Sequence, residues 1–199
     1  GVGGGFDVYY YLRKGSGSSG QTAAKINLPK TKYKVAAGAK AFNLNAKVVN
    51  GNALTYHSNR PSVVSVNKKG RITVKKPGQA VVTVKSKSSA DYTGKTVKVT
   101  FTVAPKKTAS VKVSSPRKKS LKITWKKVPS ASGYTICYSD RKDMKHYQTA
   151  TAKGSRAVSL TVNDLGSGKY VYVRVQAYYM DGKTAISGKW SKISGIKVR

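Results

Sequence analysis

The chain has 199 residues, enough for one large domain or two small ones. Lysine and arginine number 39 against six acidic residues, all of them aspartate, which gives a net charge of +33. Hydrophobic residues make up 39% of the chain, enough for packed cores. The longest apolar stretch, 170–180, is interrupted by Arg174 and Gln176, so no membrane insertion is expected.

The scarcity of carboxylates excludes several kinds of chemistry. A glycosidase needs two facing carboxylates, and a calcium site needs several carboxylate oxygens. Only Asp140 and Asp143 lie close together in the sequence, within a basic turn. His57 and His146 lie far apart and have no cysteine cluster near them, so no zinc site is expected. The sequence therefore predicts no catalytic residues, no metal site and no cofactor.

Residues 1–20 differ from the rest of the chain. A glycine-rich start, 1–5, precedes a strand-like apolar run at 6–12, and 15–20 is a Gly/Ser sequence typical of a flexible linker. We expect 6–12, if ordered, to pair with a sheet edge of this molecule or of a neighbour.

Residues 21–105 read as a series of short strands with glycine turns and no convincing amphipathic helix, a pattern typical of a β-sandwich. The expected turns contain Gly38, Gly51, Gly70 and Gly78. The expected strands are 25–28, 32–35, 41–48, 53–58, 63–66, 72–74, 80–84 and 96–103.

This region resembles the group 2 bacterial immunoglobulin-like domain. The resemblance lies in three segments, Leu54-Thr-Tyr-His-Ser-Asn-Arg-Pro-Ser-Val-Val-Ser-Val66, Lys69-Gly-Arg-Ile-Thr-Val74 and Pro77-Gly-Gln-Ala-Val-Val-Thr-Val84. The sequence departs from the family pattern at His57 and Arg60, and neither residue should disturb the core. The resemblance implies an extracellular bacterial sandwich without catalytic residues.

The pattern of residues 106–199 predicts a second sandwich. A short Pro-containing linker, 104–108, joins it to the first. The linker should hold the two modules in a semi-rigid, extended arrangement. The expected strands are 109–114, 120–125, 134–139, 146–150, 157–162, 170–178 and 190–198.

The second module resembles a fibronectin type III domain of the kind found in secreted proteins of Gram-positive gut bacteria. The residues that carry the resemblance are Leu121-Lys-Ile-Thr-Trp125, Gly133-Tyr-Thr-Ile-Cys-Tyr-Ser139, Leu165-Gly-Ser-Gly-Lys169, Val171-Tyr-Val-Arg-Val-Gln-Ala-Tyr178 and Gly188-Lys-Trp-Ser191. Alternation places two sets of side chains in the core. These are Leu121, Ile123, Trp125, Tyr134, Ile136 and Tyr138, and Val171, Val173, Val175 and Ala177.

The residues between these inward positions should lie on the outer face of the second module. They include a set of candidate ligand-binding residues: Tyr170, Tyr172, Arg174, Tyr178 and Trp190. Exposed tyrosines in a row can stack on sugar rings, and neighbouring basic residues suit an acidic glycan. The alternative is structural: lysine stems cover aromatic faces, and Arg174 stacks on Trp190 in a cation–π contact.

The single cysteine, Cys137, excludes a disulfide within the chain. Cys137 and His146 together would suggest a catalytic nucleophile and its general base. No third residue that could orient the base is evident in the sequence, so a catalytic pair is not expected. By parity Cys137 should face outward, and a free thiol that forms dimers on storage is the favoured interpretation.

The expected function is a non-enzymatic spacer or adhesion segment of a secreted or surface protein from a Gram-positive bacterium. The charge favours association with anionic wall polymers or acidic glycans. The chain should be a monomer beside neighbouring domains of one parent chain, without specific nucleic-acid binding, since no recognition motif is present. Two alternatives are a dedicated carbohydrate-binding module that uses the outward tyrosines, and accessory modules of a larger secreted enzyme.

Overall fold

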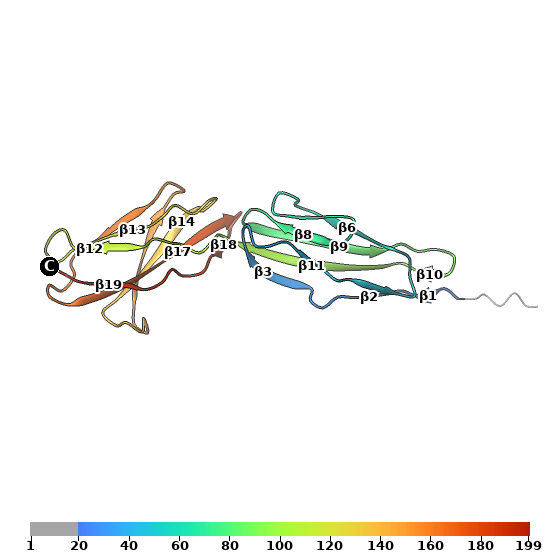
Figure 1. Ribbon diagram of the computed structural model, residues 1–199, viewed down its shortest axis with the longest axis horizontal. Helices are drawn as coiled ribbons and strands as arrows, with labels where there is room; N and C mark the ends of the chain where they lie inside the picture. Colours follow the sequence, from blue (N-terminus) through green and yellow to red (C-terminus); the bar gives the residue numbers. More distant parts are fainter. Residues whose placement is uncertain (1–19) are drawn as a thin grey trace, which may run out of the picture.

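The computed structural model describes residues 20–199, so the strand-like run predicted at 6–12 lies outside the described residues. This part of the chain is all-β, as predicted, and contains no helix. None of its segments could therefore cross a bilayer as a helix. Figure 1 shows two β-sandwiches placed end to end along the long axis.

The first sandwich comprises eleven strands. They are β1 (Thr22–Ala23), β2 (Lys25–Asn27), β3 (Lys32–Ala36), β4 (Phe42–Asn43), β5 (Lys47–Val49), β6 (Leu54–Ser58), β7 (Val64–Val66), β8 (Arg71–Val74), β9 (Gly78–Ser86), β10 (Tyr92–Thr93) and β11 (Lys95–Ala104). One layer is a four-stranded sheet in the order β3-β11-β9-β6, in which β3 runs parallel to β11. The other layer consists of two smaller sheets, β4-β8-β7 and β2-β5.

The second sandwich comprises eight strands. They are β12 (Lys112–Ser114), β13 (Leu121–Thr124), β14 (Gly133–Ser139), β15 (Gln148–Lys153), β16 (Ser159–Val162), β17 (Tyr170–Asp181), β18 (Thr184–Ser187) and β19 (Ser194–Lys197). A three-stranded sheet, β12-β13-β16, packs against a five-stranded sheet, which has the order β15-β14-β17-β18 and contains β19 as a further partner of β17. β19 pairs with residues 170–173 at the start of β17, and β18 pairs with residues 178–181 at its end.

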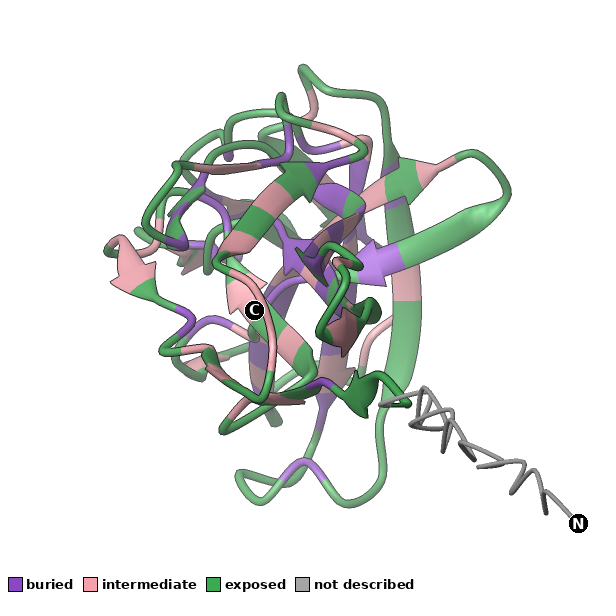
Figure 2. Ribbon diagram, turned by 90° about the vertical axis from the view of Figure 1, so that its right-hand side faces the viewer, coloured by how far each residue is buried: buried purple, intermediate pink, exposed green. Residues whose placement is uncertain are grey.

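Each sandwich has its own hydrophobic core, and the buried positions lie toward the middle of the end-on view in Figure 2. In the first core, Phe101 stacks on Tyr33 with 5.0 Å between ring centroids. In the second, Trp125 packs against Tyr134 at 5.1 Å, and the buried Tyr134 hydroxyl accepts a hydrogen bond from the Val128 amide at 2.7 Å. The residues predicted inward on 121–125 and 171–177 are all buried, because strand alternation fixes their face.

The prediction of one continuous strand at 41–48 is wrong, because the structure has two shorter strands here, β4 and β5. Asn45 adopts a left-handed conformation with φ 52°, which asparagine tolerates better than most residues. The amide of buried Leu44 donates to the Gly70 carbonyl at 3.0 Å instead of continuing a sheet. Hydrophobic alternation runs unbroken through 42–48, so the pattern gave no sign of this turn.

Three short strands were missed: β1, β10 and β18. β18 follows a tight turn at Gly182, where φ is 60°, and β17 extends three residues beyond its predicted end to Asp181. The linker predicted at 104–108 is largely packed, since Ala104, Pro105 and Thr108 are buried. This packing brings the β17–β18 turn against the first sandwich.

Candidate functional site

The five candidate residues of the second module do not form one continuous platform. Tyr170 and Tyr172 stack on each other with 6.0 Å between ring centroids, and Tyr170 is among the most exposed aromatic residues at 55%. Tyr178 lies at the other end of β17, over Gly133, where a Cβ atom would approach its hydroxyl oxygen to 2.4 Å. A ligand stacked on Tyr170 would therefore not reach Tyr178 along the strand.

Arg174 and Trp190 make the predicted cation–π contact, with the guanidinium carbon 4.6 Å from the Trp190 ring centroid. The same carbon lies 5.7 Å from the ring centroid of Tyr147, so the guanidinium is held between two aromatic rings. This stack covers the outer face of the sheet and occupies Arg174 within the protein.

The prediction of an outward, accessible thiol at Cys137 is wrong, because the side chain is buried at 1% exposure. Cys137 does lie on the outer face of β14, but its cross-strand partner is Arg174, whose stacked side chain covers that part of the sheet. Burial raises the pKa of the thiol, and the nearby Arg174 guanidinium only partly opposes the shift. A buried thiol with a raised pKa is poorly suited to nucleophilic attack or to dimer formation.

His146, the other half of that pair, is exposed, and no hydrogen bond joins its ring to Cys137 within residues 20–199. In the same range, no three His, Cys or acidic side chains lie together in a group that could hold a metal ion. Residues 20–199 therefore form neither a Cys137–His146 pair nor a metal centre.

An open hollow of about 360 Å³ lies beside Tyr170 at one end of the second sandwich. Tyr138, Tyr147 and Tyr170 supply aromatic surface, and Asp140 and Gln148 supply polar atoms. The Tyr138 hydroxyl donates to the Gln148 side-chain oxygen at 2.8 Å, which orients both groups. Sequence reasoning identified Tyr170 here but missed Tyr147, which comes from a different strand connection.

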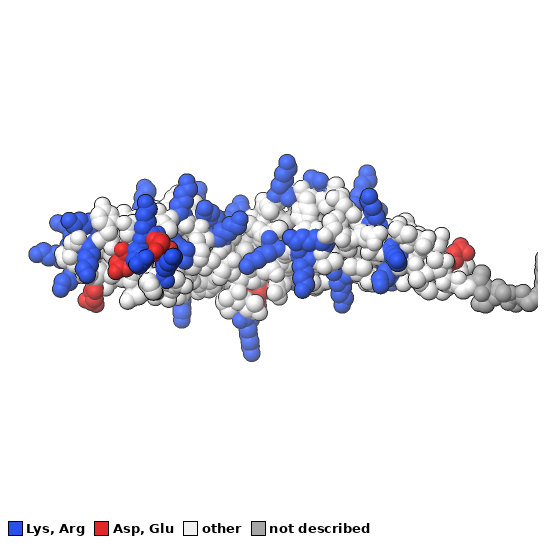
Figure 3. Space-filling view, turned by 90° about the horizontal axis from the view of Figure 1, so that it is seen from below, with Lys and Arg blue, Asp and Glu red and all other residues white. Residues whose placement is uncertain are grey.

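Every lysine in residues 20–199 is exposed, and none of them takes part in an ion pair. The two ion pairs in that range use Arg60 with Asp181 and Arg141 with Asp143. Figure 3 shows the consequence on one face, where basic side chains project from both sandwiches and acidic ones are confined to a few places. The positive charge is therefore largely uncompensated and available to an anionic partner.

The outer face of the sheet β3-β11-β9-β6 carries four of these lysines, Lys32, Lys34, Lys85 and Lys98, and we call it the lysine face. Each lysine has a threonine as its cross-strand partner: Lys32 with Thr100, Lys34 with Thr102, Lys85 with Thr96 and Lys98 with Thr83. No two of the lysines are direct cross-strand partners, so the arrangement limits repulsion between like charges. The result is an open sheet surface of ammonium and hydroxyl groups without a carboxylate.

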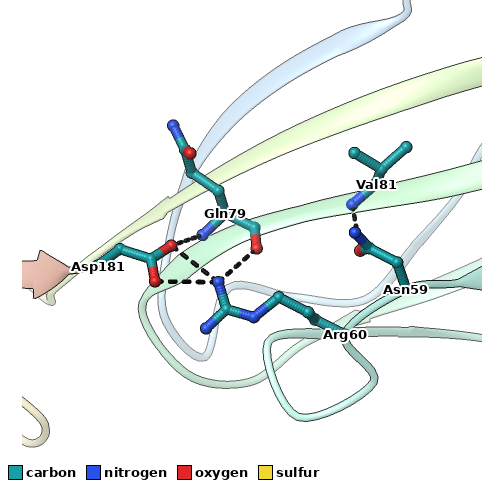
Figure 4. Close-up of polar contacts among 5 residues, drawn as sticks. All are labelled: Asn59, Arg60, Gln79, Val81 and Asp181. Atoms are coloured by element: carbon teal, nitrogen blue, oxygen red, sulfur yellow. Dashed lines mark hydrogen bonds and ion pairs between the residues drawn. The ribbon is translucent and has the colours of Figure 1, made fainter. Parts of the chain in front are cut away.

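The junction of the two sandwiches is held by a polar cluster that the sequence analysis missed (Figure 4). Asp181, at the end of β17, accepts hydrogen bonds from Arg60 Nη1 at 2.8 and 3.0 Å and from the Gln79 amide at 2.7 Å. Arg60 Nη1 also donates to the Gln79 carbonyl at 2.9 Å. The Asn59 side-chain oxygen accepts from the Val81 amide at 2.7 Å, which fixes the loop that carries Arg60. The only sequence signal was the departure of Arg60 from the family pattern.

We expect Asp181→Asn to loosen this junction while both sandwiches stay folded. Arg60 is 39% exposed and Asp181 is 16% exposed, so the coupling is screened and should be worth about 1 kcal/mol. The two modules should then tumble more independently, which ¹⁵N relaxation measures as diverging rotational correlation times. Asp143→Asn is the matched control, because it breaks an ion pair within one turn of the second sandwich.

The junction should also loosen in acid. The Arg60 side chain and then the Gln79 amide hold the pKa of Asp181 below its usual 3.8. A depressed native pKa means that the stabilisation is fully present above 3.8 and is lost as the pH falls through the lower native value. Asp181→Asn should abolish this part of the pH dependence. Identical correlation times for wild type and variant at neutral pH would contradict the assignment.

No protein-family model matches the chain, and no curated protein sequence is similar to it. The FN1–FN3 domains of chicken CNTN1 match 90% of this chain and 68% of that chain, with 17% identity and a TM-score of 0.44. The fn3 domain of human contactin 1 matches 48% of this chain and 76% of that chain, with 17% identity and a TM-score of 0.39. A fibronectin type III domain from the human KIAA0970 protein matches 46% of this chain and 72% of that chain, with 21% identity and a TM-score of 0.38.

These scores are low, so the fold assignment rests on the strand order and the two cores described above. Two sheets of mainly antiparallel strands packed face to face, with alternate residues turned inward, define the architecture of immunoglobulin-like sandwiches. The chain is a tandem of two β-sandwiches of immunoglobulin-like architecture.

Proposed function

We propose that this chain is a non-catalytic spacer in a secreted or surface protein of a Gram-positive bacterium. It displays neighbouring domains of its parent chain and associates electrostatically with anionic envelope polymers or acidic glycans. The observation that carries the proposal is that every described lysine is exposed and free of an ion pair. A surface of this kind attracts polyanions without requiring a specific pocket.

The role as a spacer is supported by the end-to-end placement of the sandwiches and by the junction between them (Figure 1). A packed linker and the Arg60–Asp181 ion pair limit bending, so the chain separates whatever lies at its two ends. The lysine face provides a polymer-contacting surface along one of the sandwiches. Wall teichoic acids and acidic polysaccharides are the natural counter-charges in this setting.

The test is sedimentation of the protein with purified Gram-positive cell walls, with and without their anionic polymers, across a salt titration. We expect binding that requires the polymers and disappears by moderate salt, since a polyanion releases condensed counterions when lysines neutralise it. Walls stripped of their anionic polymers are the control. Binding that persists without the polymers and in high salt would contradict the proposal.

A dedicated carbohydrate-binding module is the second candidate, and the hollow beside Tyr170 favours it. Tyr147 and Tyr170, at 51% and 55% exposure, both line this hollow together with Gln148 and Asp140. Two accessible rings and oriented polar groups suit a neutral sugar. The same sedimentation distinguishes the candidates, because stacking on a neutral sugar would be insensitive to salt and would be lost in Tyr170→Ala.

A further inference from the structure

The break between β4 and β5 opens a hollow in the first sandwich. It has a volume of about 800 Å³, within the range of small-molecule sites. It lies where the second layer of this sandwich divides into the sheets β2-β5 and β4-β8-β7, with the left-handed residue Asn45 in the gap. Residues on both sides of the break, Asn43 and Lys47, line the hollow, so it borders the turn directly.

Three asparagine side chains line this hollow from different segments. Asn27 ends β2, Asn43 ends β4, and Asn45 lies between β4 and β5. None of these side chains makes a hydrogen bond to another residue within 20–199, although other asparagines there, such as Asn59, do. Each free amide offers a donor and an acceptor, the combination that matches a hydroxyl group.

Tyr56 forms an aromatic part of the lining and is held firmly in place. Its ring packs over Gly70, where a Cβ atom would lie 2.8 Å from the ring carbon Cζ and where φ is 77°. The β7–β8 turn that contains Gly70 therefore fixes the ring. A fixed ring beside free amides offers both an apolar surface and hydrogen-bonding groups to a polyhydroxylated molecule.

Lys47 and Lys69 are the charged residues of the lining, and no carboxylate accompanies them. Both side chains are exposed, and neither takes part in an ion pair within the described chain. A neutral sugar would leave both ammonium groups without a partner. A bare inorganic anion would leave the three amides and the aromatic ring without one.

We propose that this hollow is a saturable binding site for an acidic sugar, meaning a molecule that combines several hydroxyl groups with one carboxylate or phosphate. The amides of Asn27, Asn43 and Asn45 bind the hydroxyls, Tyr56 contacts the apolar face, and Lys47 and Lys69 bind the anion. This site goes beyond association with a polymer, because it recognises a monomer by its hydroxyls as well as by its charge. It also stands independently of the lysine face, which lies on the opposite layer.

The experiment is a titration of the whole ¹⁵N-labelled chain, followed by NMR, at about 200 mM salt, where long-range attraction is screened. The probes are glucuronate and glycerol 3-phosphate, which distinguish a carboxylate source from a phosphate source. Methyl glucoside carries the hydroxyls alone, and inorganic phosphate carries the charge alone. We expect saturable shifts of the three asparagine side-chain amides with at least one acid, and binding about tenfold weaker or worse for both partial probes.

Two variants test the residues, Asn43→Ala and Lys69→Gln, and both should weaken binding of the acid about tenfold without lowering the melting temperature appreciably. Lys98→Gln is the matched control, because it removes an exposed lysine from the other layer of the same sandwich. The proposal is overturned if neither acid saturates, if inorganic phosphate binds equally well, or if Lys98→Gln weakens binding as much as Lys69→Gln. Salt-sensitive wall binding could persist in any of these outcomes, so failure here is distinct from failure of the spacer proposal.

Discussion

Replacing Lys32, Lys34, Lys85 and Lys98 together with glutamine is expected to weaken binding to a soluble wall polyanion more than about tenfold at low salt. All four side chains are exposed and lie on one sheet face, so a single extended polymer can contact them at the same time. Each contact releases about one counterion, so the slope of log K against log salt should fall by roughly four. Isothermal titration at several salt concentrations measures both quantities.

The control is the matching replacement of the same four lysines with arginine, which keeps the charge at each position. This variant should keep the salt slope of the wild type, because the counterion effect depends on charge and not on the shape of the ammonium group. An unchanged slope in the glutamine variant would contradict a role for the lysine face. An equal loss in both variants would show that the fold of the sheet, and not its charge, had been altered.

The outward direction of these lysines could be predicted from the sequence because they alternate with residues that face the core. Val97-Lys98-Val99 is such a case, and the structure buries Val99 and exposes Lys98, as strand geometry requires. Alternation of this kind depends only on neighbouring residues in the chain. It therefore indicates which face a residue occupies, but not what lies beside it across the sheet.

This limit explains the outcome for Cys137. Its parity placed it on the outer face of β14, which is where it lies, but exposure was inferred from the face alone. Arg174 on β17 is its cross-strand partner and is held over the sheet by Tyr147 and Trp190. Burial here depends on three other segments of the chain, and single-strand parity contains no information about them.

The junction was invisible for the same reason. Arg60 and Asp181 are 121 positions apart, and each looks like an ordinary surface residue in its own strand or loop. Their contact depends on the position of one sandwich relative to the other, which the packed linker determines. The amide-lined hollow likewise depends on one left-handed residue, Asn45, within an alternation that looked continuous. Both features depend on contacts between distant parts of the chain, which the alternation of neighbouring residues does not indicate.

Phe101→Ala is expected to unfold the first sandwich at a markedly lower temperature and to leave the second sandwich folded. Phe101 is 1% exposed, stacks on Tyr33 and contacts Phe42 at the centre of the first core, so its truncation should cost about 3–5 kcal/mol. The core of the second sandwich shares no residue with this cluster. Circular dichroism should therefore show two separated transitions in the variant.

Tryptophan fluorescence identifies which sandwich unfolds, because both tryptophans, Trp125 and Trp190, belong to the second. The first transition of Phe101→Ala should leave the fluorescence and the protection of the Cys137 thiol unchanged. Ile136→Ala, in the second core, is the reciprocal variant. It should lower the free energy of unfolding of the second sandwich by about 2–5 kcal/mol, and the fluorescence transition should shift to a lower temperature. Unfolding of both variants in a single transition that includes the change in tryptophan fluorescence would contradict this expectation. That result would mean that the junction couples the two sandwiches by more free energy than either substitution removes from its core. Within residues 20–199 the junction consists of one half-buried ion pair, the Gln79 hydrogen bonds around it and a short packed linker. A few polar contacts of this kind couple the sandwiches by much less free energy than a hydrophobic core supplies.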